Sequence, residues 1–192
     1  MHLRGLGVKQ NWKKAFKIYS KVANEGSIRA SEFVTMFYEF GFGVEKNVKK
    51  AFELCSKSAE EGYLVGQHFV GNCHQNGIGT TIDHSGSFRL FMKSTLSGNI
   101  KAMNNIGLGY SNGRGVGKDL KEAFKWFLKA AEKECYFAQY NLGLCHENCK
   151  GIDKDEVKAF EWFKKSAENE YIFGQYKIGK SFIKDMGLEK IL

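Results

Sequence analysis

The chain has 192 residues, a formal net charge of +8, and a composition that is 43% hydrophobic and 14% aromatic. This apolar content argues against intrinsic disorder, no apolar run approaches the roughly 20 residues of a membrane-spanning helix, and the first residues lack the apolar segment of a secretory signal. Most of the positive charge is dispersed lysine, which is typical of a solvated face and argues against nucleic acid as the partner.

One period of 36 residues runs through the chain. Aligned on it, five columns carry one residue type or close relatives of it. Such a period predicts an array of helix-turn-helix units, and its repetition in five columns excludes coincidence. The columns are Phe16, Phe52, Phe88, Phe124 and Phe160; Gly7, Gly43, Gly79, Gly115 and Gly151; Lys21, Lys57, Lys93, Lys129 and Lys165; Ala23, Ala59, Thr95, Ala131 and Ala167; and Val34, Val70, Ile106, Leu142 and Ile178.

Two kinds of helix alternate along the chain. We call them B helices, which carry the phenylalanine column, and A helices, which carry the branched aliphatic column. The apolar spacing of each kind matches one face of an amphipathic helix. The pattern predicts, in chain order, B at 12–25, A at 30–40, B at 48–61, A at 66–76, B at 84–97, A at 102–112, B at 120–133, A at 138–148, B at 156–169 and A at 174–184.

Each predicted B helix has clear start and stop signals. A column of N-cap residues precedes it, and in the first three copies Gly26, Gly62 and Gly98 follow it, where glycine accepts a left-handed conformation. Glu134 and Glu170 replace this glycine in the later copies, so we expect those ends to be less sharply terminated. The N-cap column reads Asn11, Asn47, Asp83, Asp119 and Asp155.

The turn from A to B helix is predicted from paired glycines, as at Gly113 and Gly115. Glycines two residues apart permit the positive φ angles of a tight return. The first of the pair is matched by Gly5, Gly41 and Gly77 but by Cys149 in the last copy, and the column Val8, Val44, Thr80, Val116 and Ile152 is expected to close the turn against the core.

With these elements placed, the chain resembles the Sel1-like repeats, which are relatives of the tetratricopeptide repeats. Their motif is nearly intact at Ala138-Gln-Tyr-Asn-Leu-Gly143 and at Ala123-Phe-Lys-Trp-Phe-Leu-Lys129-Ala-Ala-Glu132. The resemblance implies an all-α, right-handed α/α solenoid of 36-residue helix-turn-helix repeats over residues 1–192, with adaptor functions and no catalysis. The chain departs from the motif at His74 and His146 for Tyr, Ser87 and Thr95 for Ala, and Cys149 for Gly.

The predicted order, B first and A last, leaves both ends of the array without a capping unit. We therefore expect that the chain is part of a longer solenoid, or that a partner or a second copy covers its ends.

No arrangement of residues indicates a catalytic, cofactor or metal site. Gly113-Arg-Gly-Val-Gly117-Lys118 lacks the Ser or Thr and the preceding strand of a phosphate loop, so we interpret it as a repeat turn. Cys73-His74 and Cys145-His146 lie two repeats apart and cannot share one zinc ion, so we interpret them as core residues. The cysteines, five in number and out of register, favour reduced thiols and a cytoplasmic location.

The variable positions of the A helices are the candidate binding site. In tetratricopeptide-like arrangements these helices line a concave groove, where amides can bind the backbone of an extended peptide and aromatic rings supply buried area. Alternatively, the asparagines only bond to neighbouring backbone between repeats. The candidate residues are Met36, His68, Asn72, Asn104, Asn105, Leu108, Tyr140, Asn141, Leu144 and Tyr176, with Lys177 and Lys180 among the other variable positions.

Two functional hypotheses follow from the sequence. The first is a non-enzymatic scaffold or adaptor, with a role in signalling, that binds a protein segment in this groove. The second is a basic solenoid that binds a polyanion, either nucleic acid or anionic lipid, through the lysine rows of the B helices. A third reading, a secreted disulfide-linked protein with hydrolase-like activity, requires disulfides that a thiol titration would detect.

Overall fold

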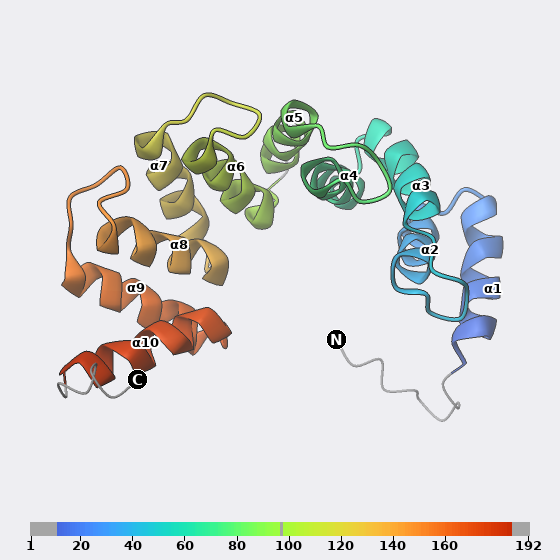
Figure 1. Ribbon diagram of the computed structural model, residues 1–192. Helices are drawn as coiled ribbons and strands as arrows, with labels where there is room; N and C mark the ends of the chain where they lie inside the picture. The colour runs from blue at the N-terminus through green and yellow to red at the C-terminus, as the bar shows by residue number, and fades with distance from the viewer. Residues whose placement is uncertain (1–10, 97, 186–192) are drawn as a thin grey trace. The chain divides into compact units, whose positions relative to one another are not determined.

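The computed structural model describes residues 11–96 and 98–185, and ten α-helices account for its regular structure within these ranges (Figure 1). The described residues form no strand, and the all-α repeat fold predicted from the period is confirmed. The helices are α1 Trp12–Asn24, α2 Ile28–Phe40, α3 Val48–Glu60, α4 Leu64–Asn76, α5 His84–Leu96, α6 Ile100–Asn112, α7 Leu120–Ala131, α8 Tyr136–Glu147, α9 Glu156–Glu168 and α10 Ile172–Asp185.

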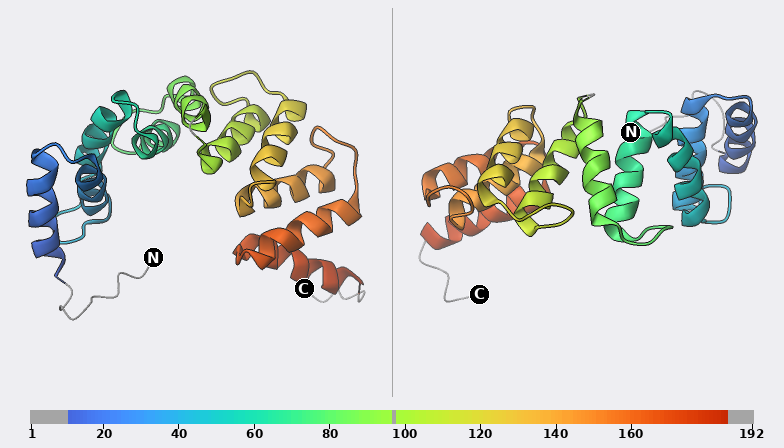
Figure 2. Two further views of the ribbon diagram at one scale, coloured as in Figure 1. Left: turned by 180° about the vertical axis from the view of Figure 1, so that it is seen from behind. Right: turned by 90° about the horizontal axis from the view of Figure 1, so that it is seen from above.

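The chain divides into two compact units, one up to Leu90 and one from Phe91. The division falls inside α5. Within each unit consecutive helices lie side by side, as α8 and α9 do in all views (Figures 1 and 2). A single solenoid across both units stays a prediction.

The A helices begin two residues before the predicted positions. α6 starts at Ile100 because Asn99 Oδ1 accepts a hydrogen bond from the Ala102 amide at 3.2 Å. Ser27 does the same for α2 through the Ala30 amide at 3.4 Å. α4 and α8 also begin two residues early, although Tyr63 and Cys135 before them make no side-chain cap hydrogen bond, so the cap accounts for the early start only at α2 and α6.

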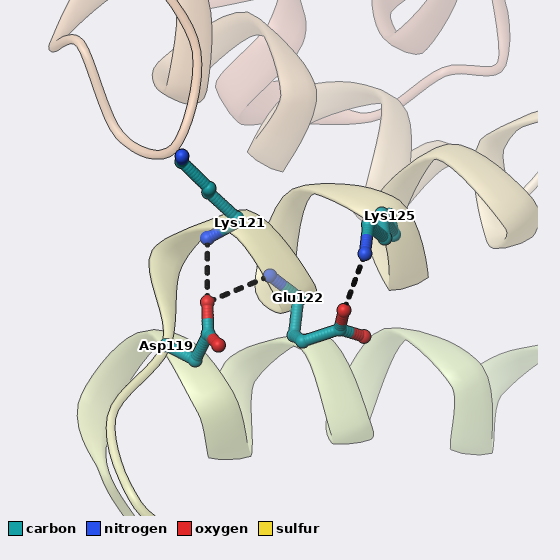
Figure 3. Close-up of polar contacts among 4 residues, drawn as sticks. All are labelled: Asp119, Lys121, Glu122 and Lys125. Atoms are coloured by element: carbon teal, nitrogen blue, oxygen red, sulfur yellow. Dashed lines mark hydrogen bonds and ion pairs between the residues drawn. The ribbon is translucent and has the colours of Figure 1, made fainter.

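All five predicted N-caps of the B helices form. At α7, Asp119 Oδ1 accepts from the amides of Lys121 at 2.9 Å and Glu122 at 3.0 Å, and Glu122 also pairs with Lys125 (Figure 3). The Lys121 side chain points away from the Asp119 carboxylate (Figure 3). The other four caps bond to amides at 2.8 to 3.0 Å.

The expectation that Glu134 and Glu170 would blunt the helix ends is wrong. Both residues adopt positive φ angles of 62° and 61°, in the same region as Gly26 at 95°. The amides of Glu134 and Glu170 bond back to Ala131 and Ala167, as the Gly26 amide bonds to Ala23. The fold therefore imposes the left-handed stop on glutamate, at a cost of about 1 kcal/mol or more for each residue.

The A-to-B turn requires glycine for two reasons: its φ angle is positive, and the backbone of another helix lies too close to leave room for a side chain. Gly43 and Gly151 have φ of 69° and 78°, and a Cβ on either would overlap the backbone of the preceding B helix, at Trp12 and at Leu120. These glycines therefore fasten each turn to the repeat before it. The corresponding positions Gly5, Gly7 and Val8 lie outside the described residues.

The phenylalanine column is half-buried, and the buried column lies one helical turn further on. Phe124 packs edge-to-face on His146, with ring centroids 5.6 Å apart, whereas Phe127 is only 2% exposed. Phe16 and Phe52 make the same edge-to-face contact with Tyr38 and His74. The two histidines thus occupy an aromatic packing position, as the sequence interpretation held.

Candidate functional site

The ten candidate residues lie on five A helices. We describe them within each unit. Met36 lies on α2, and His68 and Asn72 lie on α4, in the first unit; the others lie on α6, α8 and α10, in the second.

The asparagines of the second unit are partly structural. Asn104 is 6% exposed, and its Oδ1 accepts a hydrogen bond from Asn141 Nδ2 of the next A helix at 2.9 Å. A neutral buried hydrogen bond of this kind contributes about 1 kcal/mol, and an unpaired partner costs more. Asn104 therefore joins α6 to α8 and is not available to a partner. For this pair the alternative interpretation, in which the asparagines form bonds between repeats, is correct, except that the acceptor is a side chain and not the backbone.

Tyr140 also has a structural role. Its ring lies 5.6 Å from Phe163 and 5.5 Å from Tyr171, in a cluster that extends to Tyr136 and Phe173. Burial within this cluster raises the pKa of the Tyr171 hydroxyl. Replacing Tyr140 would therefore disturb the packing of α8 on α9 as well as any binding surface.

A column of partly exposed residues remains on the A helices. Leu108 and Leu144 occupy one column, 36 residues apart, and both are half-buried, although Leu108 also packs against the core. Met36 holds the same column in the first unit and is 46% exposed, and Tyr176 on α10 is 66% exposed. We define the A-ridge of the second unit as Leu108, Leu144 and Lys180, which are one repeat apart in succession.

The polar candidates of the first unit contact each other. Asn72 Nδ2 lies 3.4 Å from His68 Nδ1, one turn apart on α4. Both side chains are half-buried, and Met36 lies on the neighbouring A helix of the same unit. The contact between His68 and Asn72 fixes the orientation of both side chains, and a partner could bind to their polar groups.

A depression of about 830 Å³ lies among α8, α9 and α10. Its lining includes Phe160, Lys180 and the ion pair between Lys177 and Glu147, which links successive A helices. The Lys177 ammonium also lies 5.2 Å from the Phe163 ring centroid. Sequence reasoning missed Glu147, because nothing in its own column marks it; only the opposite charge of Lys177, thirty residues later, hints at the pair.

Burial disfavours ionisation of the core thiols. It raises the pKa of Cys73 to about 12 and that of Cys145 to about 11, so both thiols are protonated at neutral pH and are poor nucleophiles and metal ligands. Among the described residues, no group of three His, Cys, Asp or Glu side chains is placed to hold a metal ion. No helix in the described ranges is long and apolar enough to cross a membrane.

The chain belongs to the Sel1 repeat family. The Sel1 repeat model matches residues 1–27, 30–63, 64–99, 100–135 and 137–171, and each match from residue 30 on contains one A and one B helix. Proteins of this family generally mediate protein–protein interactions, and it is a family of non-catalytic repeat scaffolds. Comparison with curated proteins gave no significant match.

Solved structures agree with this assignment. A Sel1 repeat protein from Oxalobacter formigenes is 31% identical with a TM-score of 0.89, over 97% of this chain and 76% of that one. The protective antigen c5321 of uropathogenic Escherichia coli, which has this fold, is 27% identical with a TM-score of 0.80, over 97% of this chain and 40% of that one. The immunity protein Pa5087 of Pseudomonas aeruginosa, at 23% identity and a TM-score of 0.58 over 85% of this chain and 61% of that one, shares the fold.

Proposed function

We propose that this chain is a non-enzymatic scaffold that binds an extended segment of a partner protein along the A-ridge of its second unit. An adaptor role in signalling within the cytoplasm is part of this proposal. The observation that supports it is that different residues of the A helices have different roles, some joining the helices and others lying at the surface. Asn104 and Asn141 hold α6 and α8 together, while the neighbouring column leaves Leu108, Leu144 and Lys180 at the surface.

The spacing of the ridge defines the partner segment. Helices pack roughly 10 Å apart, and an extended chain advances roughly 3.3 Å per residue, so one repeat corresponds to about three residues of the segment. Leu108 and Leu144 favour apolar side chains, and the exposed Lys180 favours a carboxylate. We therefore expect a segment with two apolar residues about three positions apart, followed by Asp or Glu after a similar interval.

Selection from a library of random peptides tests this proposal. Peptides selected on the parent chain should carry the motif and should lose at least tenfold in affinity on Leu144→Asp, which places a charge under the segment. Leu144 is half-buried and lies outside the aromatic cluster, so its replacement should leave the helices folded and lower the free energy of unfolding by only about 1 to 2 kcal/mol. Lys121→Glu, on the exposed face of α7, is the matched control and should bind like the parent. Equal binding to Leu144→Asp would place the site elsewhere.

The structure does not favour the polyanion hypothesis. Lys129 and Lys165 of the lysine column lie over the rings of Trp126 and Trp162, 4.8 Å and 4.4 Å from the centroids. These two lysines thus cover aromatic surface of their own helices. A polyanion complex would still weaken steeply with salt, whereas peptide binding on the A-ridge should change little.

A further inference from the structure

The two A-to-B turns of the first unit lie next to each other. A Cβ on Gly43 would overlap the backbone of Trp12 and Lys13, so the turn before α3 rests on the start of α1. A Cβ on Gly79 would lie 2.4 Å from the Val48 carbonyl oxygen, so the turn before α5 rests on the start of α3. The turns and the helix starts therefore share one edge of the unit (Figure 2, right). We define this turn edge as residues 11–14, 40–50 and 77–83.

Four apolar side chains of the turn edge are exposed at positions where the second unit is polar. Phe40 and Ile82 are 54% and 62% exposed, and Phe42 and Ile78 are exposed as well. In the second unit the column of Phe40 holds asparagine, that of Ile82 holds lysine, and that of Phe42 and Ile78 holds arginine or lysine. The repeat therefore does not require an apolar residue in these columns. The residues of the second unit are Asn112 and Asn148, Lys118 and Lys154, and Arg114 and Lys150.

Aromatic stacking holds the two exposed phenylalanines in place. The Phe42 ring lies 5.0 Å from that of Trp12 and 5.6 Å from that of Phe40, with interplanar angles of 21° and 25°. Trp12 in turn meets the buried Phe37 edge-to-face at 6.2 Å, which ties the stack to the core. The rings therefore present a fixed apolar surface and lose little conformational freedom when a partner covers them.

The starts of α1 and α3 make the turn edge positive. Each begins with two exposed lysines, and helix side chains lean toward the N-terminus, which places these lysines toward the edge. A helix N-terminus favours acidic residues, and α7 and α9 each carry one in the first turn, whereas α1, α3 and α5 carry none. Helix stability therefore does not explain the lysines, which are Lys13, Lys14, Lys49 and Lys50.

Basic residues outnumber acidic ones on the turn edge. The acidic residues are Glu45 and Asp83, and Asp83 is engaged as the N-cap of α5, where its Oδ1 accepts a hydrogen bond from the Gly86 amide at 2.8 Å. The basic residues are Lys46 and the four lysines of the helix starts. A partner of this edge therefore meets exposed apolar side chains with an excess of ammonium groups among them.

We propose that the turn edge of the first unit docks on an anionic lipid surface, with Phe40, Phe42 and Ile82 in the headgroup region and the lysines beside the lipid phosphates. A membrane interface offers apolar and anionic groups together, which matches this combination of side chains. Turns at an edge reach into a flat surface, whereas an extended peptide binds in a groove. The lysine column lies in the last turns of the B helices and is not part of this edge.

Co-sedimentation with lipid vesicles tests the proposal. Phosphatidylcholine vesicles with about one third phosphatidylserine should bind the parent chain at low salt, and phosphatidylcholine alone should bind it about tenfold more weakly. Ile82→Lys adds a positive charge but removes an apolar side chain, so it should weaken binding to the mixed vesicles by about tenfold. Val65→Lys makes the same change in charge at the start of α4, on the opposite edge of the unit, and should bind like the parent.

Lys49→Glu tests the charge and should weaken binding to the mixed vesicles by about tenfold or more. Lys121→Glu is the matched control, because it makes the same change in the same column of the second unit, and it should bind like the parent. Leu144→Asp should also bind vesicles like the parent, so vesicle binding and peptide binding can fail independently.

The substituted residues Ile82 and Lys49 are exposed, so thermal melting should show that both variants stay folded. Tighter vesicle binding by Ile82→Lys would identify a simple polyanion site and overturn the proposal. Equal losses in Lys49→Glu and Lys121→Glu would do the same, because the turn edge would then have no special role. A parent chain that does not sediment with the mixed vesicles at low salt would also overturn it, and would leave this edge to a protein partner.

Discussion

The two units fill one contact differently, between an A-helix residue and the residue twenty positions later on the following B helix. In the first unit the A-helix residue is Thr35 and the B-helix residue is Cys55, joined by a hydrogen bond. In the second unit glycine faces phenylalanine, at Gly107 with Phe127 and at Gly143 with Phe163. A larger residue on one helix thus accompanies a smaller one on the other. The repeat fixes the volume of the contact and the register, and it leaves the residue type free.

The largest effect on the free energy of unfolding is expected at Gly143 in the second unit, where the Phe163 ring leaves no room for a side chain. Gly143→Leu drives a side chain into the Phe163 ring and should lower the free energy of unfolding by about 3 kcal/mol or more. Gly179→Leu, in the same column, should cost nothing, because no described atom outside its own helix lies within 4 Å of a Cβ placed there. Urea denaturation of both variants measures the difference. Equal stabilities would show that the contact between Gly143 and Phe163 is not tightly packed.

Replacing the Thr35–Cys55 pair of the first unit by the glycine–phenylalanine pair of the second tests whether the two contacts have the same total side-chain volume. Cys55→Phe alone overpacks the first unit and should cost about 2 to 3 kcal/mol. Adding Thr35→Gly should recover at least 1 kcal/mol, because the new ring then meets glycine as in the second unit. A double-mutant cycle by chemical denaturation gives the coupling energy. Additive effects would contradict the volume exchange.

The helix stops also differ between the units. The first unit ends its B helices with Gly26 and Gly62, whereas the second, after Gly98 at the end of α5, places Glu134 and Glu170 at positive φ. Glu134→Gly relieves the strained conformation but gives glycine more freedom in the unfolded chain, so a net stabilisation of about 0.5 to 1 kcal/mol is expected. Thermal melting measures it, with Glu132→Gly, where φ is −61°, as the control that should destabilise. A loss of stability in Glu134→Gly would show that the glutamate is not strained.

The histidines of the aromatic column give the smallest expected effect. His74 is half-buried in the first unit and His146 is buried in the second, and Nδ1 of each has no hydrogen-bond partner among the described residues. Desolvation lowers the pKa of His146 below its ordinary value of 6.5; nearby Asp155 and a hydrogen bond to the Asp153 backbone oppose this effect, and Lys158 reinforces it. Because the unfolded chain then binds the proton more readily, stability should decline as the pH falls below about 6.5.

His146→Phe should remove this part of the pH dependence, and because it eliminates the unpaired nitrogen but also the hydrogen bond to the Asp153 backbone, the free energy of unfolding at pH 7 should change by less than about 1 kcal/mol. Denaturation of the parent and the variant at a series of pH values between about 5 and 7 measures both effects. The same pH slope in the two proteins would rule out His146 as the source.

The period was sufficient to predict the number of helices, their alternation and the N-caps, because each is fixed by residues that recur in every copy. It could not decide which phenylalanine is buried. Phe124 and Phe127 lie on one apolar stripe, and only the packing of α6 and α8 on both sides of α7 buries the second. Glu134 was misjudged for a related reason, since its neighbours impose a conformation that its own side chain disfavours.

The candidate site was predicted less well than the fold. Asn104 and Asn105 are adjacent and identical in type, yet Asn104 is buried and joins two helices while Asn105 is half-buried. Which asparagine meets Asn141 depends on the distance between α6 and α8, and a single repeat carries no information on that distance. Of the predicted residues, Met36 and Tyr176 are exposed, and Leu108 and Leu144 are half-buried.

Hydrogen–deuterium exchange of the chain with and without a selected peptide tests the central proposal most directly. A segment on the A-ridge should slow amide exchange in α6, α8 and α10 while leaving the outer faces of α7 and α9 unchanged, and Leu144→Asp should abolish that protection. Protection confined to the B helices, or protection that persists in Leu144→Asp, would contradict the assignment of the A-ridge as the binding surface.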